Sequence, residues 1–225
     1  MSERTRRGPI GRLFSASDLE SVREATRQAE AGTSGEVVSY AVERCHGYDG
    51  ALWLAATLGA LGSAVLASLL HDYRQVWGGS PLLWIAAPPL IGAGVGYLLA
   101  RLVPTVHRAF IPDSALDRLT RLRAEAAFLE EEVFKTRART GLLIFLALFE
   151  HRVVILADEG INQVVDDAEW VAIAERLATG IRQGQAAAAL VEAIDSCGRL
   201  LAERGVDRPP DDDNELRDEL RLRDE

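Results

Sequence analysis

The sequence is poor in cysteine, and it has no basic excess. Its 225 residues include only two cysteines, Cys45 and Cys197, which are too few and too far apart for a disulfide framework or a closely spaced zinc site. The formal net charge is -9, so the broad positive surface of a nucleic-acid-binding protein is missing. We therefore expect no nucleic-acid partner.

Common enzyme signatures are also absent. The chain contains no GxSxG, HExxH, Walker or CxxC motif. Its four histidines are scattered, and the adjacent Cys45 and His46 would point to opposite faces of a strand. The residues by themselves predict no catalytic group and no cofactor.

The chain does contain two long apolar segments without a single charge. They are Ala51 to Leu70, "ALWLAATLGALGSAVLASLL", and Leu82 to Ala100, "LLWIAAPPLIGAGVGYLLA". At about 1.5 Å per helical residue, each segment is roughly 30 Å long, which is the thickness of a bilayer's hydrocarbon core. We predict a transmembrane hairpin over residues 51–104, with helices at about 51–70 and 82–103. The alternative of two fully buried core helices would need more surrounding protein than this chain supplies.

Residues at the ends and on the faces of these helices fit a bilayer. Aromatic rings and long basic side chains favour the headgroup region, which predicts membrane-interface positions for Trp53, Trp77, Trp84 and Arg101. Small residues let helices approach closely in lipid. The helix-packing candidates of this kind are Gly59, Ser63, Gly92 and Gly96. They would pack the hairpin on itself or dock it on another membrane protein, and the sequence leaves both alternatives open.

Arginines predict the orientation of the hairpin. A hairpin returns the chain to the side from which it entered, and that side carries Arg44, Arg101, Arg108 and the basic N-terminal segment 1–14. The connecting loop carries only Arg74. The positive-inside rule then predicts a multi-pass protein of the inner or cytoplasmic membrane, with both termini and the folded domain on the cytoplasmic side.

The segments on either side of the hairpin predict one discontinuous domain, 15–45 plus 113–205. Ser15 to Ala31 is typical of an amphipathic helix, with Ser17 and Glu20 as a capping box. Glu36 to Arg44 is rich in β-branched residues and is typical of a strand. A long helix follows from Asp113 to about Thr136. Its apolar residues at helical spacing predict a buried face of Leu116, Leu119, Leu122, Ala126, Leu129 and Val133.

The stretch "TGLLIFLALFEHRVVILADEG", residues 140–160, predicts the centre of that domain. Neither of its apolar runs, Gly141 to Phe149 and Val153 to Ala157, is long enough to span a bilayer as a helix. Both have the length and the Ile, Val and Leu content of buried strands, joined by a short polar loop, so we predict two antiparallel central strands. Helices over about 167–180 and 183–204 complete a small three-layer α/β sandwich. The charged C-terminal tail, 206–225, is predicted to be disordered in the free protein.

At this point the sequence resembles the TPM-domain family, which includes thylakoid photosystem II repair proteins and bacterial membrane proteins. The resemblance rests on "SGEVVSYAVER", "FKTRART", "GLLIFLALFEHRVVILAD" and "EGINQVVDDAEW". It implies a TPM-like α/β fold with the transmembrane hairpin inserted after the first strand. It also implies a role in the assembly, repair or stabilisation of membrane complexes, and, in some members, acid phosphatase activity and divalent-metal binding.

The acidic turn of the family is only partly matched. Many relatives read Gly-x-Gly-Leu-Glu-Gly-x-x-Pro-Asp where this chain reads "DEGINQVVDD". Gly160 and Asp167 match, whereas the internal Glu falls on Asn162 and the Pro on Asp166. The resemblance implies a calcium or magnesium site at Asp158, Glu159, Asp166 and Asp167. The alternative for these acids is a solvated turn with a helix N-cap at Asp166 or Asp167.

Two functions follow from these observations. The first is a non-enzymatic accessory or assembly subunit that docks on a larger integral membrane complex, with a photosynthetic complex as the leading example. The alternative is a membrane-anchored, divalent-metal-dependent acid phosphatase.

Overall fold

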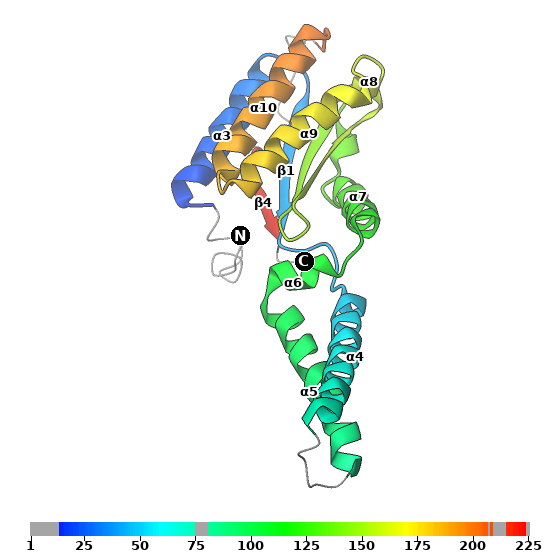
Figure 1. Ribbon diagram of the computed structural model, residues 1–225. Coiled ribbons are helices and arrows are strands. Elements are labelled where there is room, and N and C mark those ends of the chain that lie inside the picture. The colour runs from blue at the N-terminus through cyan, green and yellow to red at the C-terminus, as the bar shows by residue number, and fades with distance from the viewer. Residues whose placement is uncertain (1–13, 75–80, 207, 209–214, 224–225) are drawn as a thin grey trace. The chain divides into compact units, whose positions relative to one another are not determined.

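The computed structural model describes residues 14–74, 81–206, 208 and 215–223 (Figure 1). The chain divides into two compact units. One, the α/β unit, combines Met1–His46 with Leu116–Glu225, and the other, the hairpin unit, is Gly47–Ala115.

A four-stranded sheet in the order β3-β2-β1-β4 forms the centre of the α/β unit. β1 (Glu36–Val42) and β2 (Gly141–Ala147) pair in parallel, and both strands are buried along their full length. β3 (Arg152–Ala157) runs antiparallel to β2, and β4 (Arg221–Arg223) runs parallel to β1. Parallel neighbours require a long crossover, and here the hairpin unit lies within that crossover.

Helices cover both faces of the sheet (Figure 1). α3 (Ala16–Ala31), α9 (Asp167–Arg182) and α10 (Ala186–Glu203) lie on one face, where their apolar side chains form a core with those of β2. α7 (Asp113–Glu130) lies on the other face with its own smaller core. Two short elements, the 3₁₀ helix Val133–Lys135 and α8 (Glu159–Asn162), connect the larger ones. The predicted three-layer α/β fold, with two apolar helices inserted after the first strand, is confirmed.

The start of α3 differs from the prediction. Ser15, not Ser17, is the N-cap: its hydroxyl accepts from the Asp18 amide at 3.2 Å, and the Asp18 carboxylate accepts from the Ser15 amide at 2.8 Å. The motif S-x-x-D therefore forms the capping box two residues before the predicted S-x-x-E pair, because aspartate can also reach back to the cap.

The buried face of α7 is also different. The helix ends at Glu130, and Leu122 and Leu129 are 54% and 64% exposed. The residues turned to the sheet are Leu116, Thr120, Ala124 and Ala127. Large rings from the sheet, Tyr40 and Phe145, fill this layer, so small residues on the helix give the better packing.

β3 lies at the edge of the sheet and not at its centre. All six of its residues are half-buried, whereas β2 is fully buried. The prediction of two antiparallel strands was right, but only β2 is central. Apolar composition did not separate the two, because α7 and α9 flank β3 and keep its side chains half-covered.

Residues 215–223 of the tail are ordered, contrary to the predicted disorder. The buried carboxylate of Glu36 accepts hydrogen bonds from the amides of Glu215 and Leu216, at 3.2 and 3.1 Å. Leu220 and Leu222 are buried in the core beside α3 and α10. The charged composition of the tail therefore gave no sign of the short amphipathic strand β4, which forms the second edge of the sheet.

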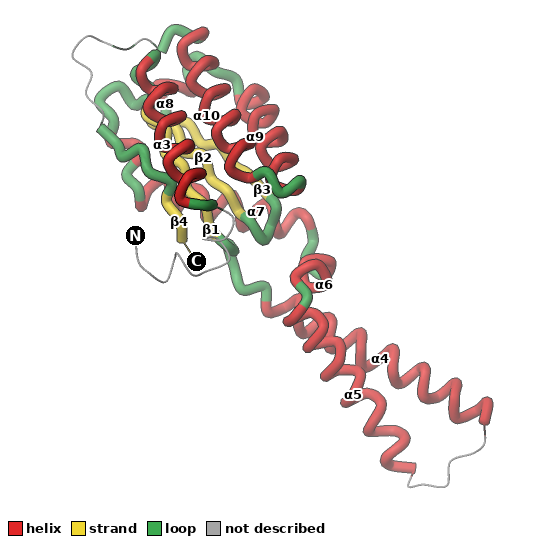
Figure 2. The backbone as a smooth tube through the Cα atoms, turned by 90° about the vertical axis from the view of Figure 1, so that its left-hand side faces the viewer, coloured by secondary structure: helices red, strands yellow, loops and turns green. Residues whose placement is uncertain are grey.

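The hairpin unit consists of α4 (Asp49–Arg74), α5 (Pro81–Leu102) and the short α6 (Pro104–Ala109) (Figure 2). α4 and α5 are long and apolar enough to cross a membrane. Only 17% and 6% of their apolar windows is buried, which is not the pattern of a soluble protein's core helix. The two helices could therefore span a membrane.

The small residues pack the hairpin on itself. A Cβ at Gly59 would lie 2.2 Å from the Gly92 carbonyl oxygen, and one at Gly96 would lie 2.4 Å from the Ala55 carbonyl oxygen. The Ser63 hydroxyl donates to the Pro88 carbonyl at 2.7 Å across the same contact. These four residues therefore lie at the contact between α4 and α5.

The predicted interface residues are described only in part. Trp53 is 68% exposed, and Arg101 is in the last turn of α5. Trp77 and the side chain of Trp84 lie outside the described residues, as does most of the basic N-terminal segment.

Close helix packing predicts that Gly59 tolerates no side chain. The substitution Gly59→Ile forces α4 and α5 apart and should lower the stability of the purified full-length protein by about 1–3 kcal/mol. The measurement is thermal unfolding in detergent micelles. Gly62→Ile is the matched control, because nothing lies within 4 Å of a Cβ at that position of α4. Equal effects of the two substitutions would contradict the packing.

The buried side chain of Glu30 predicts that the stability of the folded protein depends on pH. It is 7% exposed and accepts from the Val37 amide at 2.9 Å. Burial, with a smaller effect from Glu36, raises the pKa of Glu30 to about 8. The folded pKa exceeds the unfolded value of about 4.3, so stability is full at low pH and falls as pH rises through about 8.

The test of this prediction is Glu30→Gln, which keeps the acceptor for the Val37 amide. It should remove the loss of stability between pH 5 and pH 9, a loss of at most about 4 kcal/mol. Denaturant unfolding at the two pH values measures the difference. An unchanged pH slope in the variant would show that Glu30 is ionised in the folded protein.

Candidate functional site

The acidic turn between β3 and α9 is the first candidate site. β3 ends at Ala157, and Asp158 leaves the sheet while its amide still donates to the Gly141 carbonyl at 2.9 Å. α8 then leads to Asp166, the N-cap of α9. The turn therefore lies at one end of the sheet, directly after a paired strand.

Asp158 has a structural role in this turn. Its side chain is buried, its Oδ1 accepts from the Glu159 amide at 2.8 Å, and the same oxygen lies 3.0 Å from the Arg139 Nη2. The carboxylate therefore caps α8 and neutralises a guanidinium. Its Oδ2 is buried without a hydrogen-bond partner among the described residues.

Gly160 and Asn162 fix the turn by close contacts with neighbouring backbone. A Cβ at Gly160 would lie 2.6 Å from the Ala138 carbonyl oxygen, so the close approach requires glycine. The Asn162 amide nitrogen donates to the Ala157 carbonyl at 2.8 Å. An ionised glutamate, which the resemblance would place here, cannot donate. The departure from the family pattern thus creates a bond that ties the turn to β3.

The four acids predicted to bind a metal have different surroundings. Glu159, Asp166 and Asp167 are exposed, whereas Asp158 is buried and paired. The Asp166 side chain makes no capping bond, although its backbone is the N-cap of α9. In the described part of the chain, no group of three or more His, Cys, Asp or Glu side chains is placed to hold a metal ion. A calcium or magnesium centre does not fit this turn as it is folded.

The two thiols are not activated. Burial, with a further effect of Glu150, raises the pKa of Cys45 to about 12, and burial raises that of Cys197 to about 12. Both stay protonated at neutral pH, and a thiol is a poor nucleophile. His107, in the hairpin unit, is buried, and its Nε2 donates to the Tyr48 carbonyl at 3.2 Å.

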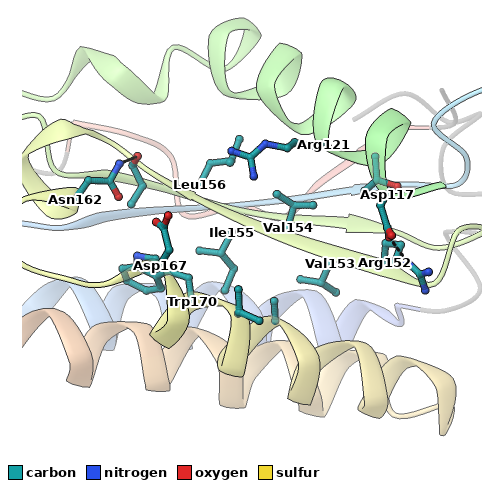
Figure 3. Close-up of a pocket in the computed structure, with 14 residues that line it drawn as sticks. Asp117, Arg121, Arg152, Val153, Val154, Ile155, Leu156, Asn162, Asp167 and Trp170 are labelled. Carbon is teal, nitrogen blue, oxygen red and sulfur yellow. Dashed lines mark hydrogen bonds and ion pairs between the residues drawn. The ribbon is translucent and has the colours of Figure 1, made fainter. Parts of the chain in front are cut away.

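A groove of about 680 Å³ follows the outer edge of β3 and is the second candidate site (Figure 3). Side chains of residues 152–157 form its floor, α7 contributes Thr120 and Arg121, and α9 contributes Trp170 and Val171. Arg152 and Asp117 lie paired at one end, and Asn162 and Asp167 lie at the other. Apolar strand residues line the groove along its length, and Arg121 lies between its two polar ends.

Sequence reasoning found only one side of this groove. It singled out Asp167 as an acid of the turn, but it missed Trp170 and the strand edge because it placed β3 at the centre of the sheet. The signal was present in "EHRVVILADEG", where charges flank a short apolar strand on both sides. Within β3 itself, the charged residue Arg152 is typical of an edge strand, because charges on an edge discourage pairing with other chains.

Comparison with known proteins agrees with this architecture. Residues 106–200 match the family model described as the TPM domain. This match confirms the resemblance to the TPM-domain family over those residues. The fold is similar to the NMR structure of the BA42 protein from the psychrophilic bacterium Bizionia argentinensis, with a TM-score of 0.55 and 19% identity, over 93% of this chain and 94% of that one. No curated protein matches.

The geometry of the turn predicts which acid matters for folding. Asp158→Ala removes the α8 cap and leaves Arg139 without its buried partner, so it should cost about 1–3 kcal/mol of stability. Asp167→Ala, at an exposed position nine residues further along the chain, should cost under about 1 kcal/mol. Denaturant unfolding of the two variants measures both effects. The reverse order would mean that Asp167 and not Asp158 holds the turn.

Proposed function

We propose that this protein is an integral membrane accessory subunit that docks on a larger membrane complex. The observation that carries the proposal is that its small residues and Asp158 serve the fold itself. Gly59, Gly92 and Gly96 pack α4 on α5, and Asp158 caps α8. What remains for other molecules is the apolar outer surface of the hairpin and the groove beside β3.

The outer surface of the hairpin suits lipid or another membrane helix. Its large apolar side chains are 46–73% exposed, and such a surface is unfavourable in water. The members with the greatest exposure are Trp53, Leu69, Leu83, Ile85, Leu90, Ile91 and Leu102. Both helices then cross the inner or cytoplasmic membrane. The arginines that flank them favour the cytoplasmic side for both termini and the α/β unit.

The resemblance supports a partner class for the accessory subunit. It includes proteins of photosystem II repair, so a photosynthetic or other energy-transducing membrane complex is the first partner to test. The alternative function, a divalent-metal-dependent acid phosphatase, has less support. Its acids do not converge, and the residue in place of the family's glutamate is the hydrogen-bond donor Asn162.

Purification from native membranes tests the proposal. In a mild detergent the protein should migrate in an assembly well above its own 24.5 kDa, together with integral membrane partners. Glu175→Ala should migrate in the same way, since this exposed acid of α9 lies outside both the hairpin and the groove. A protein that runs alone would contradict an accessory role.

Phosphate release separates the alternative from the proposal. The purified protein is assayed with a generic phosphomonoester and magnesium, manganese or calcium. An accessory subunit should release no phosphate above the detergent blank. Hydrolysis that Asp167→Ala abolishes would establish the phosphatase instead.

A further inference from the structure

The outer edge of β3 presents backbone groups that no strand of the sheet satisfies. In the antiparallel register, Leu143, Phe145 and Ala147 lie opposite Leu156, Val154 and Arg152. The Asp158 amide donates to Gly141, and bonded positions alternate along such a ladder. Arg152, Val154 and Leu156 therefore bond inward to β2. Val153 and Ile155 point their N–H and C=O groups outward, and β3 is the last strand on this side of the described sheet.

The unpaired edge ends at a defined residue. The carbonyl of Ala157 also faces outward, but the Asn162 side chain donates to it at 2.8 Å. At the opposite end, Arg152 is paired with Asp117. Val153 and Ile155, the outward-facing residues on either side of Val154, thus remain available between the two ends. They offer two N–H donors and two C=O acceptors, which is the pattern that an extended polypeptide matches.

The helices that flank β3 favour the addition of a single strand over pairing with the sheet of a second copy. α9 packs on β3, and its Val171, which is 54% exposed, lines the groove beyond the strand. In a two-fold, antiparallel pairing of β3 with β3 of another copy, the two strands would be about 4.8 Å apart. The two α9 helices would then lie side by side on the same face, where packed helices need roughly 8–10 Å. A lone extended segment carries no such helix and fits between α7 and α9.

The charges of the groove indicate one feature of the segment. Arg152 and Arg121 are already paired within the α/β unit, with Asp117 and Glu125. Asp167 has no ion-pair partner among the described residues, and it lies at the Asn162 end (Figure 3). The groove as a whole therefore has one uncompensated charge, which is negative and at that end.

We propose that this groove binds an extended segment of a partner protein as an added strand beside β3. The segment has alternating apolar side chains that contact the floor and a lysine or arginine at the Asp167 end. Its backbone exchanges hydrogen bonds with Val153 and Ile155. This proposal rests on the accessory function, because it names the surface through which the α/β unit attaches to its partner.

Nuclear magnetic resonance with a defined peptide tests the site. The probe is Ac-Lys-Val-Thr-Val-Thr-Val-NH₂ at millimolar concentration, added to the full-length protein in lipid nanodiscs with ¹⁵N-labelled Val, Ile and Trp. The amides of Val153 and Ile155 should shift and become protected from exchange, as should the indole of Trp170, which lines the groove. The same peptide, N-methylated on alternate amides that face β3, should not bind. Equal shifts with both peptides, or none with either, would overturn the proposal.

Two substitutions test the strand edge and the charge of the groove separately. Val153→Pro removes an outward N–H without touching the ladder to β2, and it should abolish the shifts. Asp167→Lys alters only an exposed charge. It should weaken the binding of the lysine peptide about two- to tenfold. It should strengthen the binding of the same peptide with glutamate in place of the lysine. Glu175→Lys, an exposed acid of α9 outside the groove, is the control that should change neither affinity. If Asp167→Lys behaves like Glu175→Lys, the charge assignment is wrong.

The two proposals fail differently. If the native assembly survives in Val153→Pro and Asp167→Lys, the accessory function stands and the groove is not its attachment surface. If the peptide binds as expected but the protein runs alone from native membranes, the groove stands and the accessory function fails.

Discussion

The parallel hydrogen bonding between β1 and β2 holds this molecule together. Seven residues of each strand pair in register, from Glu36 with Gly141 to Val42 with Ala147, and all of them are buried. The pairing joins two parts of the chain that a 26-residue and a 22-residue helix separate in sequence. Both cores of the α/β unit are built on the two faces of this strand pair. Without it, the segment before the hairpin would lose its pairing with β2 and keep its contacts with α10 and β4.

The position of the insertion explains how an α/β fold can carry a membrane hairpin. A parallel crossover already needs a long connection, so extending it between β1 and α7 leaves the sheet register unchanged. Within the hairpin, Gly59, Gly92 and Ser63 provide close backbone contact and an interhelical hydrogen bond. The large apolar side chains are left on the outside, where lipid or a partner helix can cover them.

Features set by local composition could be predicted from the sequence, and features set by tertiary neighbours could not. Uninterrupted apolar runs identified α4, α5 and β2, because each run covers most of its element and little beyond it. The edge position of β3, the exposure of Leu122 and Leu129, and the ordering of Leu220 and Leu222 depend on what packs beside them. The site follows the same division. The acidic turn could be identified from the sequence. The pairing of Asp158 with Arg139 and the groove beside β3 could be identified only from the structure.

The α/β unit uses Asp158 to stabilise a turn, and its exposed groove is suited to binding. Both depend on the β1–β2 pairing in the full-length protein. Tyr40 and Phe145 lie opposite each other in that pairing, and their rings stack with centroids 5.6 Å apart. A nuclear Overhauser effect between the two rings, measured in lipid nanodiscs, tests the pairing most directly. The structure predicts a strong cross-peak. Its absence, with the amides of residues 141–147 in contact with lipid, would contradict the fold and the function argued from it.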